Sequence, residues 1–148
     1  SHLDYNSNKM KTSLAVQTLS KSVSKSLVYC RDRFEQFRDS RATSRFLELF
    51  NNIFDWLNSR SKFGREKSEP LQETNCEQWS SDFRNMKKYI LSLKDKRGVP
   101  LVTGPRKCAF LGLVVTMQSF LFMYQCYVST RQLDYLLSFK FSQDHLGN

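Results

Sequence analysis

The stretch TNCEQWSSDFRNMKKYILSL, residues 74–93, decides the fold class. Thr74 is followed three residues later by Glu77, which is the pattern of a capping box that satisfies two unpaired backbone donors at the start of a helix. The apolar residues after it recur at steps of three and four, so that they share one helical face. They are Cys76, Trp79, Phe83, Met86, Ile90 and Leu93. We therefore predict a helix that begins after Thr74 and buries this face.

Similar spacings on both sides of this stretch predict further helices. We expect one helix over residues 11–37 and a second that begins at a cap, Thr43 or Ser44, and ends at about residue 57. Two more are expected over residues 106–127 and 131–139. Polar loops are expected at 58–70 and 94–105. The 148 residues contain only 5 Gly and 3 Pro, too few for a turn-rich β-sandwich or barrel. The fold class that follows is all-α, a single helical bundle of about five helices.

The uncharged segment 108–130 is long enough to cross a bilayer. Thr116, Gln118, Ser119 and Gln125 interrupt it, and the rest of the chain has the amphipathic pattern of a soluble protein. We interpret the segment as a fully buried central helix and expect no membrane partner.

Basic residues dominate the charge of the chain, with 23 Lys and Arg against 14 Asp and Glu and a formal net charge of +9. Between residues 84 and 107, eight cations face one acid, Asp95. Phosphates are the natural counter-charge for such a cluster, whereas a solvated basic face is the plainer alternative. The residues that we predict to contact DNA are Arg84, Lys87, Lys88, Lys96, Arg97 and Arg106.

Several classes of active site are absent from the sequence. It contains no GxxxxGK[ST] phosphate loop and no HExxH or GxSxG motif. Its four cysteines are widely spaced, which favours reduced thiols over a disulfide framework or a zinc site. Asp55, Asp95 and Asp144 are the acids available for metal-assisted chemistry, but each has a plainer role at the surface or at a helix end. Nucleophilic hydrolysis is therefore not expected.

Four segments in order resemble the P element-type transposases, which include the THAP-domain transposases. They are KMKTSLAVQTLSKSVSKSL at 9–27, LFNNIFDWLNSRSKFG at 49–64, YILSLKDKRGVPLV followed by RKCAFLG between 89 and 112, and YLLSFKFSQDHL at 135–146. The resemblance implies a helical GTP-binding domain that is inserted into an RNase H-like catalytic domain. It further implies that both catalytic aspartates precede residue 1, and that the position of the catalytic glutamate is occupied here by Gly147.

This resemblance divides the chain into three parts. Residues 1–8 are expected to be a flank or a cloning remnant, residues 9–141 the helical insertion domain, and residues 142–148 the start of the last helix of the catalytic domain. The chain then lacks a complete catalytic triad, and no enzymatic activity of its own is expected.

The resemblance also implies GTP as a cofactor, with Mg²⁺ as its companion ion. It assigns Asp144 to the guanine base, because a carboxylate can accept both N1–H and the N2 amino group; a helix N-terminal carboxylate is the alternative. Without a phosphate loop, isolated cations and helix N-termini must hold the phosphates. The first choice for these contacts is Asn58, Ser59, Arg60 and Lys62, and the second is Lys94, Asp95 and Lys107 with Arg106.

Two functions remain open. The chain is either a module that binds GTP without hydrolysing it and helps a nuclear transposase to hold DNA, or a protein-interaction domain of a domesticated transposase that has lost nucleotide binding. Asp144 and the basic loops favour the first function, whereas Gly147 favours the second.

Overall fold

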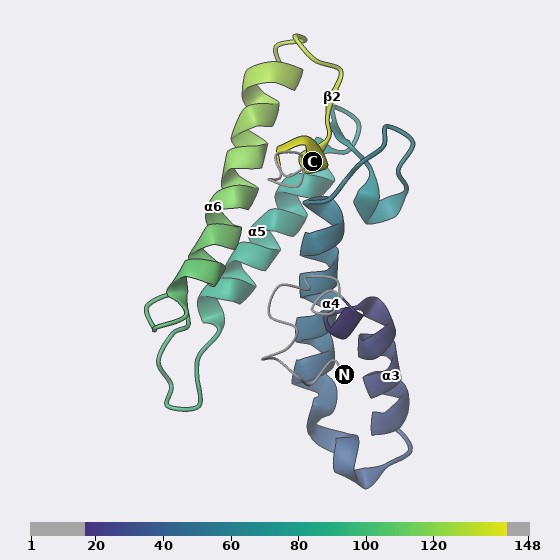
Figure 1. The fold of residues 1–148 in the computed structure, drawn as a ribbon, viewed down its shortest axis with the longest axis vertical. Coiled ribbons are helices and arrows are strands. Elements are labelled where there is room, and N and C mark those ends of the chain that lie inside the picture. The colour runs from purple at the N-terminus through teal and green to yellow at the C-terminus, as the bar shows by residue number, and fades with distance from the viewer. Residues whose placement is uncertain (1–16, 142–148) are drawn as a thin grey trace, which may run out of the picture. The chain divides into compact units, whose positions relative to one another are not determined.

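The computed structural model describes residues 17–141, and the chain divides into two compact units, Ser1–Asp55 and Trp56–Asn148. The described residues contain four α-helices, α3 (Lys21–Arg31), α4 (Arg41–Trp56), α5 (Cys76–Ser92) and α6 (Lys107–Met123), shown in Figure 1. A two-stranded sheet pairs β1 (Leu71–Gln72) with β2 (Tyr135–Leu136). The mostly helical class is confirmed, whereas the sheet was not predicted. That all helices form one bundle stays a prediction.

In the first unit, α3 is connected to α4 by the 3-10 helix Glu35–Ser40. Ser20 caps α3, and its Oγ accepts a hydrogen bond from the backbone N–H of Val23 at 3.4 Å. The two helices are joined where the buried Ser24 Oγ donates to the carbonyl of Ser44 at 2.8 Å. A second link runs from the backbone N–H of Lys21 to Asn51 Oδ1 at 3.0 Å. These two hydrogen bonds therefore fix how α3 pairs with α4. Leu47 and Ile53 of α4 are buried.

Two predictions for this unit are wrong. A continuous helix to residue 37 is contradicted because α3 ends at Arg31, and a 3-10 helix follows. A cap at Thr43 or Ser44 is contradicted because α4 already begins at Arg41. Ser44 lies inside the first turn, where its Oγ donates to the carbonyl of Arg41 at 3.0 Å instead of accepting from a backbone N–H.

In the second unit, α5 and α6 lie side by side and run in opposite directions (Figure 1). Their core is a cluster of aromatic rings. Trp79 of α5 lies 5.7 Å from Trp56, 5.3 Å from Phe83 and 5.4 Å from Phe120 between ring centroids. The spacings and tilted or edge-on ring angles are those that aromatic pairs prefer. The predicted apolar face of α5 is confirmed at Trp79, Phe83, Met86 and Ile90, which are all buried.

The start of α5 differs from the prediction by one residue. Asn75, not Thr74, precedes the helix, and Asn75 makes no side-chain cap bond. Its Oδ1 instead accepts from the backbone N–H of Gln72 at 3.0 Å, while its Nδ2 donates to the carbonyl of Pro70 at 2.9 Å. The Asn75 amide thus fastens the turn between β1 and α5, and the predicted capping box of Thr74 and Glu77 is wrong.

The end of the described chain also differs from the prediction. A helix over 131–139 is contradicted, because β2 occupies Tyr135–Leu136 and a 3-10 helix occupies Ser138–Phe141. The register pairs Leu71 with Leu136 and Gln72 with Tyr135 in antiparallel fashion. This pairing attaches the C-terminal segment to the residues that lead into α5. Residues 142–148, with the predicted boundary of the catalytic domain, lie outside the described residues.

The helix α6 follows the predicted bounds closely and continues into a π-helical turn, Tyr124–Val128. Its predicted full burial is wrong. Only Val114, Met117 and Phe120 of α6 are buried, whereas Val115 and Phe122 are 59% and 65% exposed. Within residues 17–141, one helical segment, Lys107–Val128, has the length and apolar composition of a membrane span. That the chain has no membrane partner stays a prediction.

Candidate nucleotide-binding site

The loop 58–62 follows α4 and is held in place by Ser59, whose side chain is fully buried. The Ser59 N–H donates to Ser138 Oγ at 2.8 Å, and the Ser59 Oγ donates to the carbonyl of Ser68, also at 2.8 Å. The carbonyl of Ser59 accepts from the N–H of Phe139 at 3.1 Å. All polar groups of Ser59 are thus used to fasten the loop, which fixes the geometry of its neighbours.

Ser138 connects this loop to the end of α4. Its Oγ accepts from Ser59 and donates to the carbonyl of Trp56 at 2.6 Å. Helices leave their last carbonyls without intrahelical partners, so this hydroxyl satisfies an end of α4 and the loop together. The result is a rigid junction between segments that are distant in sequence.

Arg60 is the exposed cation that this junction positions. Its guanidinium carbon lies 3.9 Å from the centroid of the Phe139 ring, and its Nε donates to Asn58 Oδ1 at 3.2 Å. A guanidinium held over a ring still has its terminal nitrogens as a planar pair of donors, which suits phosphate or carboxylate. The predicted residues Asn58, Ser59 and Arg60 are therefore brought together with the segment that leads, five residues after Phe139, to Asp144. Asp144 itself lies outside the described residues.

Lys62 lies farther along the same loop. Its Nζ is 4.8 Å from the centroid of the exposed Phe63 ring. The loop then turns back at Gly64, where a Cβ would meet the carbonyl oxygen of Ser68 at 2.0 Å. This is the carbonyl that accepts from Ser59, so the close approach at Gly64 belongs to the same junction.

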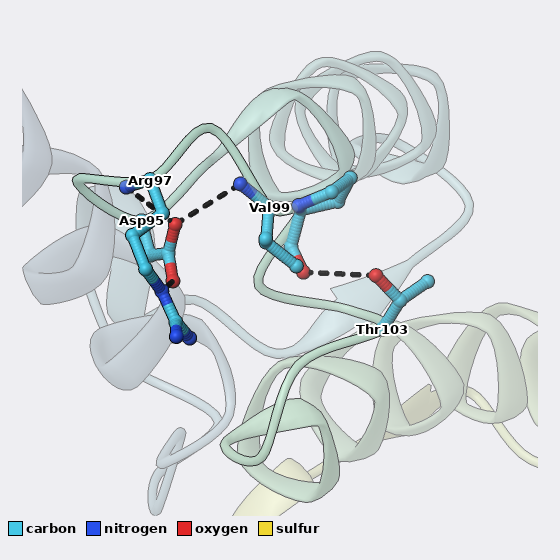
Figure 2. Close-up of polar contacts among 5 residues, drawn as sticks. Asp95, Arg97, Val99 and Thr103 are labelled. Atoms are coloured by element: carbon cyan, nitrogen blue, oxygen red, sulfur yellow. Dashed lines mark hydrogen bonds and ion pairs between the residues drawn. The ribbon is translucent and has the colours of Figure 1, made fainter.

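The second predicted cluster lies in the loop between α5 and α6. Lys94 pairs with Pro100 across a short bridge, and Asp95 turns its carboxylate into the loop (Figure 2). One Asp95 oxygen accepts from the N–H groups of Arg97 and Val99 at 2.8 and 3.0 Å, and the other accepts from Arg97 Nε at 3.2 Å. These backbone bonds, with Val99 first, lower the pKa of Asp95. The structure thus gives Asp95 a loop-stabilising role; a cofactor contact there stays a prediction.

The two predicted clusters belong to opposite ends of the hairpin formed by α5 and α6. Loop 58–62 is fastened to the segment that follows β2, which pairs with the strand before α5. The loop of Lys94 follows the far end of α5 (Figure 1). A 17-residue helix such as α5 is about 25 Å long. The two clusters are therefore separate candidates and not parts of one mononucleotide site.

The cations predicted to contact DNA spread over α5 and the α5–α6 loop. Arg84 and Lys87 line a groove of about 570 Å³ between α5 and α6, whose floor includes Phe83, Val114 and Met117. Lys88 is exposed on α5, while Lys96, Arg97, Arg106 and Lys107 are exposed at the loop end of the hairpin. We refer to these seven cations as the basic surface of the second unit; their contact with DNA stays a prediction.

Sequence patterns missed two polar contacts near these sites. Lys67 pairs with Asp82 at 2.9 Å and lies 4.3 Å from the centroid of the Trp56 ring. Tyr124 opens the π-helical turn, and a hydrogen bond to Cys76, followed by burial, raises its pKa to about 12. No periodicity signals a side-chain contact between separate elements, so neither was predictable. Within residues 17–141, no group of three or more His, Cys, Asp and Glu side chains could hold a metal ion.

Known proteins resemble the chain along most of its length. Residues 1–70 match the family described as the TNP-like, GTP-binding insertion domain. The human (Homo sapiens) DNA transposase THAP9 is 32% identical over 140 residues, which cover 93% of this chain and 16% of THAP9. A chain of the Drosophila P element transposase strand transfer complex has the same fold, with a TM-score of 0.68 at 21% identity. The match covers 94% of our chain and 30% of that one. Over 140 residues the chain is therefore homologous to a segment of the transposase THAP9, and its residues 1–70 match the TNP-like, GTP-binding insertion domain.

Proposed function

We propose that the chain binds GTP as a cofactor that it does not hydrolyse, with the phosphates at loop 58–62. The observation that carries this proposal is the stacking of Arg60 on Phe139, at 3.9 Å, within a junction that Ser59 and Ser138 hold rigid. A preorganised guanidinium loses little side-chain freedom on binding, and its paired donors suit a phosphate.

The described residues of this junction, together with Asp144 from outside them, are assigned here to distinct parts of a guanine nucleotide. Arg60 would contact the phosphates, with Asn58 and Lys62 beside it, and Asp144 would accept hydrogen bonds from guanine N1–H and N2. Ser59 is buried and fully bonded, so we assign it the positioning of Arg60 and not a direct contact. Mg²⁺, which prefers phosphate oxygens and water, would enter with the nucleotide.

A calorimetric titration with GTP, GDP and ATP in the presence of magnesium tests this function. We expect saturable binding of the guanine nucleotides, no binding of ATP, and loss of the preference in Asp144→Asn, which exchanges one acceptor for a donor. Arg65→Ala removes an exposed cation three residues after loop 58–62 and should bind GTP normally. Equal binding of ATP and GTP, or no binding at all, would overturn the proposal.

We further propose that DNA lies against the basic surface of the second unit. The cations of α5 and the α5–α6 loop support it, as does the shared fold with a chain of the P element transposase strand transfer complex. Because the relatives are much longer, transposition would need parts outside this chain, which itself would perform no catalytic step. DNA as a partner would place the protein in the nucleus.

A protein-interaction domain is the second candidate function, and the exposed apolar residues of α6 favour it. Phe122, Val115 and Leu111 expose 65%, 59% and 40% of their surface. Contiguous apolar surface of this kind marks contact sites more often than ordinary protein surface does. In this alternative the domain has lost nucleotide binding, so saturable binding of GTP in the titration above would exclude it.

A further inference from the structure

The groove of about 570 Å³ between α5 and α6, which we call the α5–α6 groove, is long and narrow. On α5 it is lined by residues from Cys76 to Lys87, which corresponds to about 16 Å or three helical turns. The two helices run in opposite directions, and Tyr124 of α6 is hydrogen-bonded to Cys76 (Figure 1). Tyr124 therefore lies at one end of the groove, and Val114 lies at the other, near Lys87.

The floor of the α5–α6 groove is apolar. Phe83, Val114, Met117 and Leu121 form it. The first three are buried members of the core, whereas Leu121 is only half-buried. Apolar side chains of a bound partner would leave water on this floor, which is the favourable term in most protein association.

The charges along the groove differ between its two ends. Arg84 and Lys87 line one end, and the exposed Glu77 lies at the other. Within residues 17–141, neither Arg84 nor Lys87 forms an ion pair, whereas Lys67 and Arg97 of the same unit each pair with an aspartate. The groove thus offers two unpaired cations beside an apolar floor.

These features match an acidic amphipathic helix better than they match DNA or a second copy. A helix with an apolar stripe fits a groove of this length, and carboxylates at one of its ends would pair with Arg84 and Lys87. DNA phosphates would use the two cations, but they would leave the apolar floor uncovered and would meet Glu77. A second copy of the chain carries a net charge of +9 and is a poor source of acids.

From these observations we propose that the α5–α6 groove binds an amphipathic helix of a partner protein, whose apolar stripe covers the floor and whose acidic residues pair with Arg84 and Lys87. The inference does not depend on the proposed nucleotide site, since no residue of loop 58–62 lines the groove. A bound helix would cover two cations of the basic surface and leave the other five to DNA.

Calorimetric titration of the chain with synthetic peptides tests this proposal. Each peptide has about 15 residues, with leucines at helical spacing and two glutamates at one end. One peptide carries the glutamates at its N-terminal end and another at its C-terminal end, because a helix can lie in the groove in either direction. We expect saturable binding of one of them, and binding weaker by about tenfold or more when lysines replace its glutamates. No binding of either glutamate peptide, or equal binding of the lysine peptide, overturns the proposal.

Lys87→Gln and Lys88→Gln form a matched pair of variants. Both remove one positive charge from neighbouring residues of α5, but only Lys87 lines the groove. Lys87→Gln and Arg84→Gln should each weaken peptide binding by about threefold or more, whereas Lys88→Gln should bind the peptide as the wild type does. Circular dichroism verifies that each variant keeps its helices. Equal effects of Lys87→Gln and Lys88→Gln would show attraction to the net charge alone and overturn the proposal.

The temperature dependence of the binding heat tests the contact with the apolar floor. Burial of apolar surface gives a negative change in heat capacity, which we expect for the glutamate peptide. A change near zero would show that the peptide contacts only the charged rim, and this contradicts a helix that lies in the groove. Loss of duplex DNA binding in Arg84→Gln and Lys87→Gln, with no peptide bound by the wild type, would assign the groove to DNA instead.

Discussion

Ser59 and Ser138 lie 79 positions apart in the sequence and are joined by a 2.8 Å hydrogen bond from the Ser59 N–H to the Ser138 Oγ. Both residues are buried. The Ser138 hydroxyl also donates to the carbonyl of Trp56. This pair fixes loop 58–62 against the segment that carries Phe139, and thereby places Arg60.

Ser138→Ala should therefore destabilise the fold. The substitution leaves the Ser59 N–H and the Trp56 carbonyl without this partner, and unsatisfied buried groups cost about 1–3 kcal/mol. Urea unfolding followed by circular dichroism measures the change. Ser92→Ala is the control, since this exposed hydroxyl bonds only the carbonyl of Tyr89 in its own helix, at 2.7 Å, and it should change stability by less than about 0.5 kcal/mol. Equal effects of the two substitutions would show that the junction is not needed for stability.

Gly64→Ala should disrupt the same junction from another side. The added Cβ would lie 2.0 Å from the carbonyl oxygen of Ser68, so the backbone must shift. We expect a loss of about 1–3 kcal/mol in the free energy of unfolding. Gly112→Ala, in open space on α6, should stabilise the chain by about 0.5–1 kcal/mol. A neutral Gly64→Ala would contradict the close packing of this loop.

Much of the fold followed from periodicity. α5 was predicted within about two residues of its observed bounds, and α6 begins one residue after its predicted start and ends four residues before its predicted end, where a π-helical turn takes over. Unbroken three- and four-residue spacing and the flanking loops define such helices well. The burial of Trp79 and Phe83 followed from the same spacing. The helix predicted over residues 11–37 was too long. Its apolar residues keep the same spacing beyond both ends of α3, although the observed helix is capped by Ser20 and ends at Arg31.

Other features depend on contacts that no local pattern reveals. β1 and β2 have two residues each, which is too short for the alternation of apolar and polar residues that signals a strand. They are also separated in the sequence by most of the second unit. α6 is apolar on nearly all sides, and composition alone could not show which side packs inward. For the candidate site, the sequence shows that loop 58–62 carries cations, and their contact with a nucleotide stays a prediction. The contact of Arg60 with Phe139 and the anchoring by Ser138 were visible only in three dimensions.

Tyr124 should give the chain a distinct alkaline titration. Its pKa is raised to about 12 by the hydrogen bond to Cys76 and by burial, whereas an unfolded tyrosine ionises near about 10. The contribution of the protonated phenol to stability is therefore fully present below pH about 10 and is lost as the pH rises through about 12. Phenolate absorbance should show one late tyrosine, which disappears in Tyr124→Phe. If Tyr124→Phe instead removes a tyrosine that ionises at a lower pH, the assignment is contradicted.

Binding of DNA to the basic surface should weaken steeply as salt rises. Each phosphate contact contributes about 0.9 to the slope of log affinity against log salt concentration. Lys88→Gln and Lys96→Gln remove exposed cations of this surface, and each should lower the slope by about that amount. Lys25→Gln, an exposed cation of α3, is the control. Fluorescence anisotropy of labelled duplex DNA measures the slopes, and unchanged slopes in both variants would exclude these residues as phosphate contacts.

The most direct test of the central claim is a GTP titration of Arg60→Ala beside Lys107→Ala. The two cations belong to opposite ends of the α5–α6 hairpin, so one nucleotide cannot contact both. If the phosphates lie at loop 58–62, Arg60→Ala should weaken GTP binding by about tenfold or more, as expected for a lost charged hydrogen-bond pair, while Lys107→Ala binds GTP as the wild type does. Loss of binding in Lys107→Ala with normal binding in Arg60→Ala would move the site to the α5–α6 loop and contradict the account.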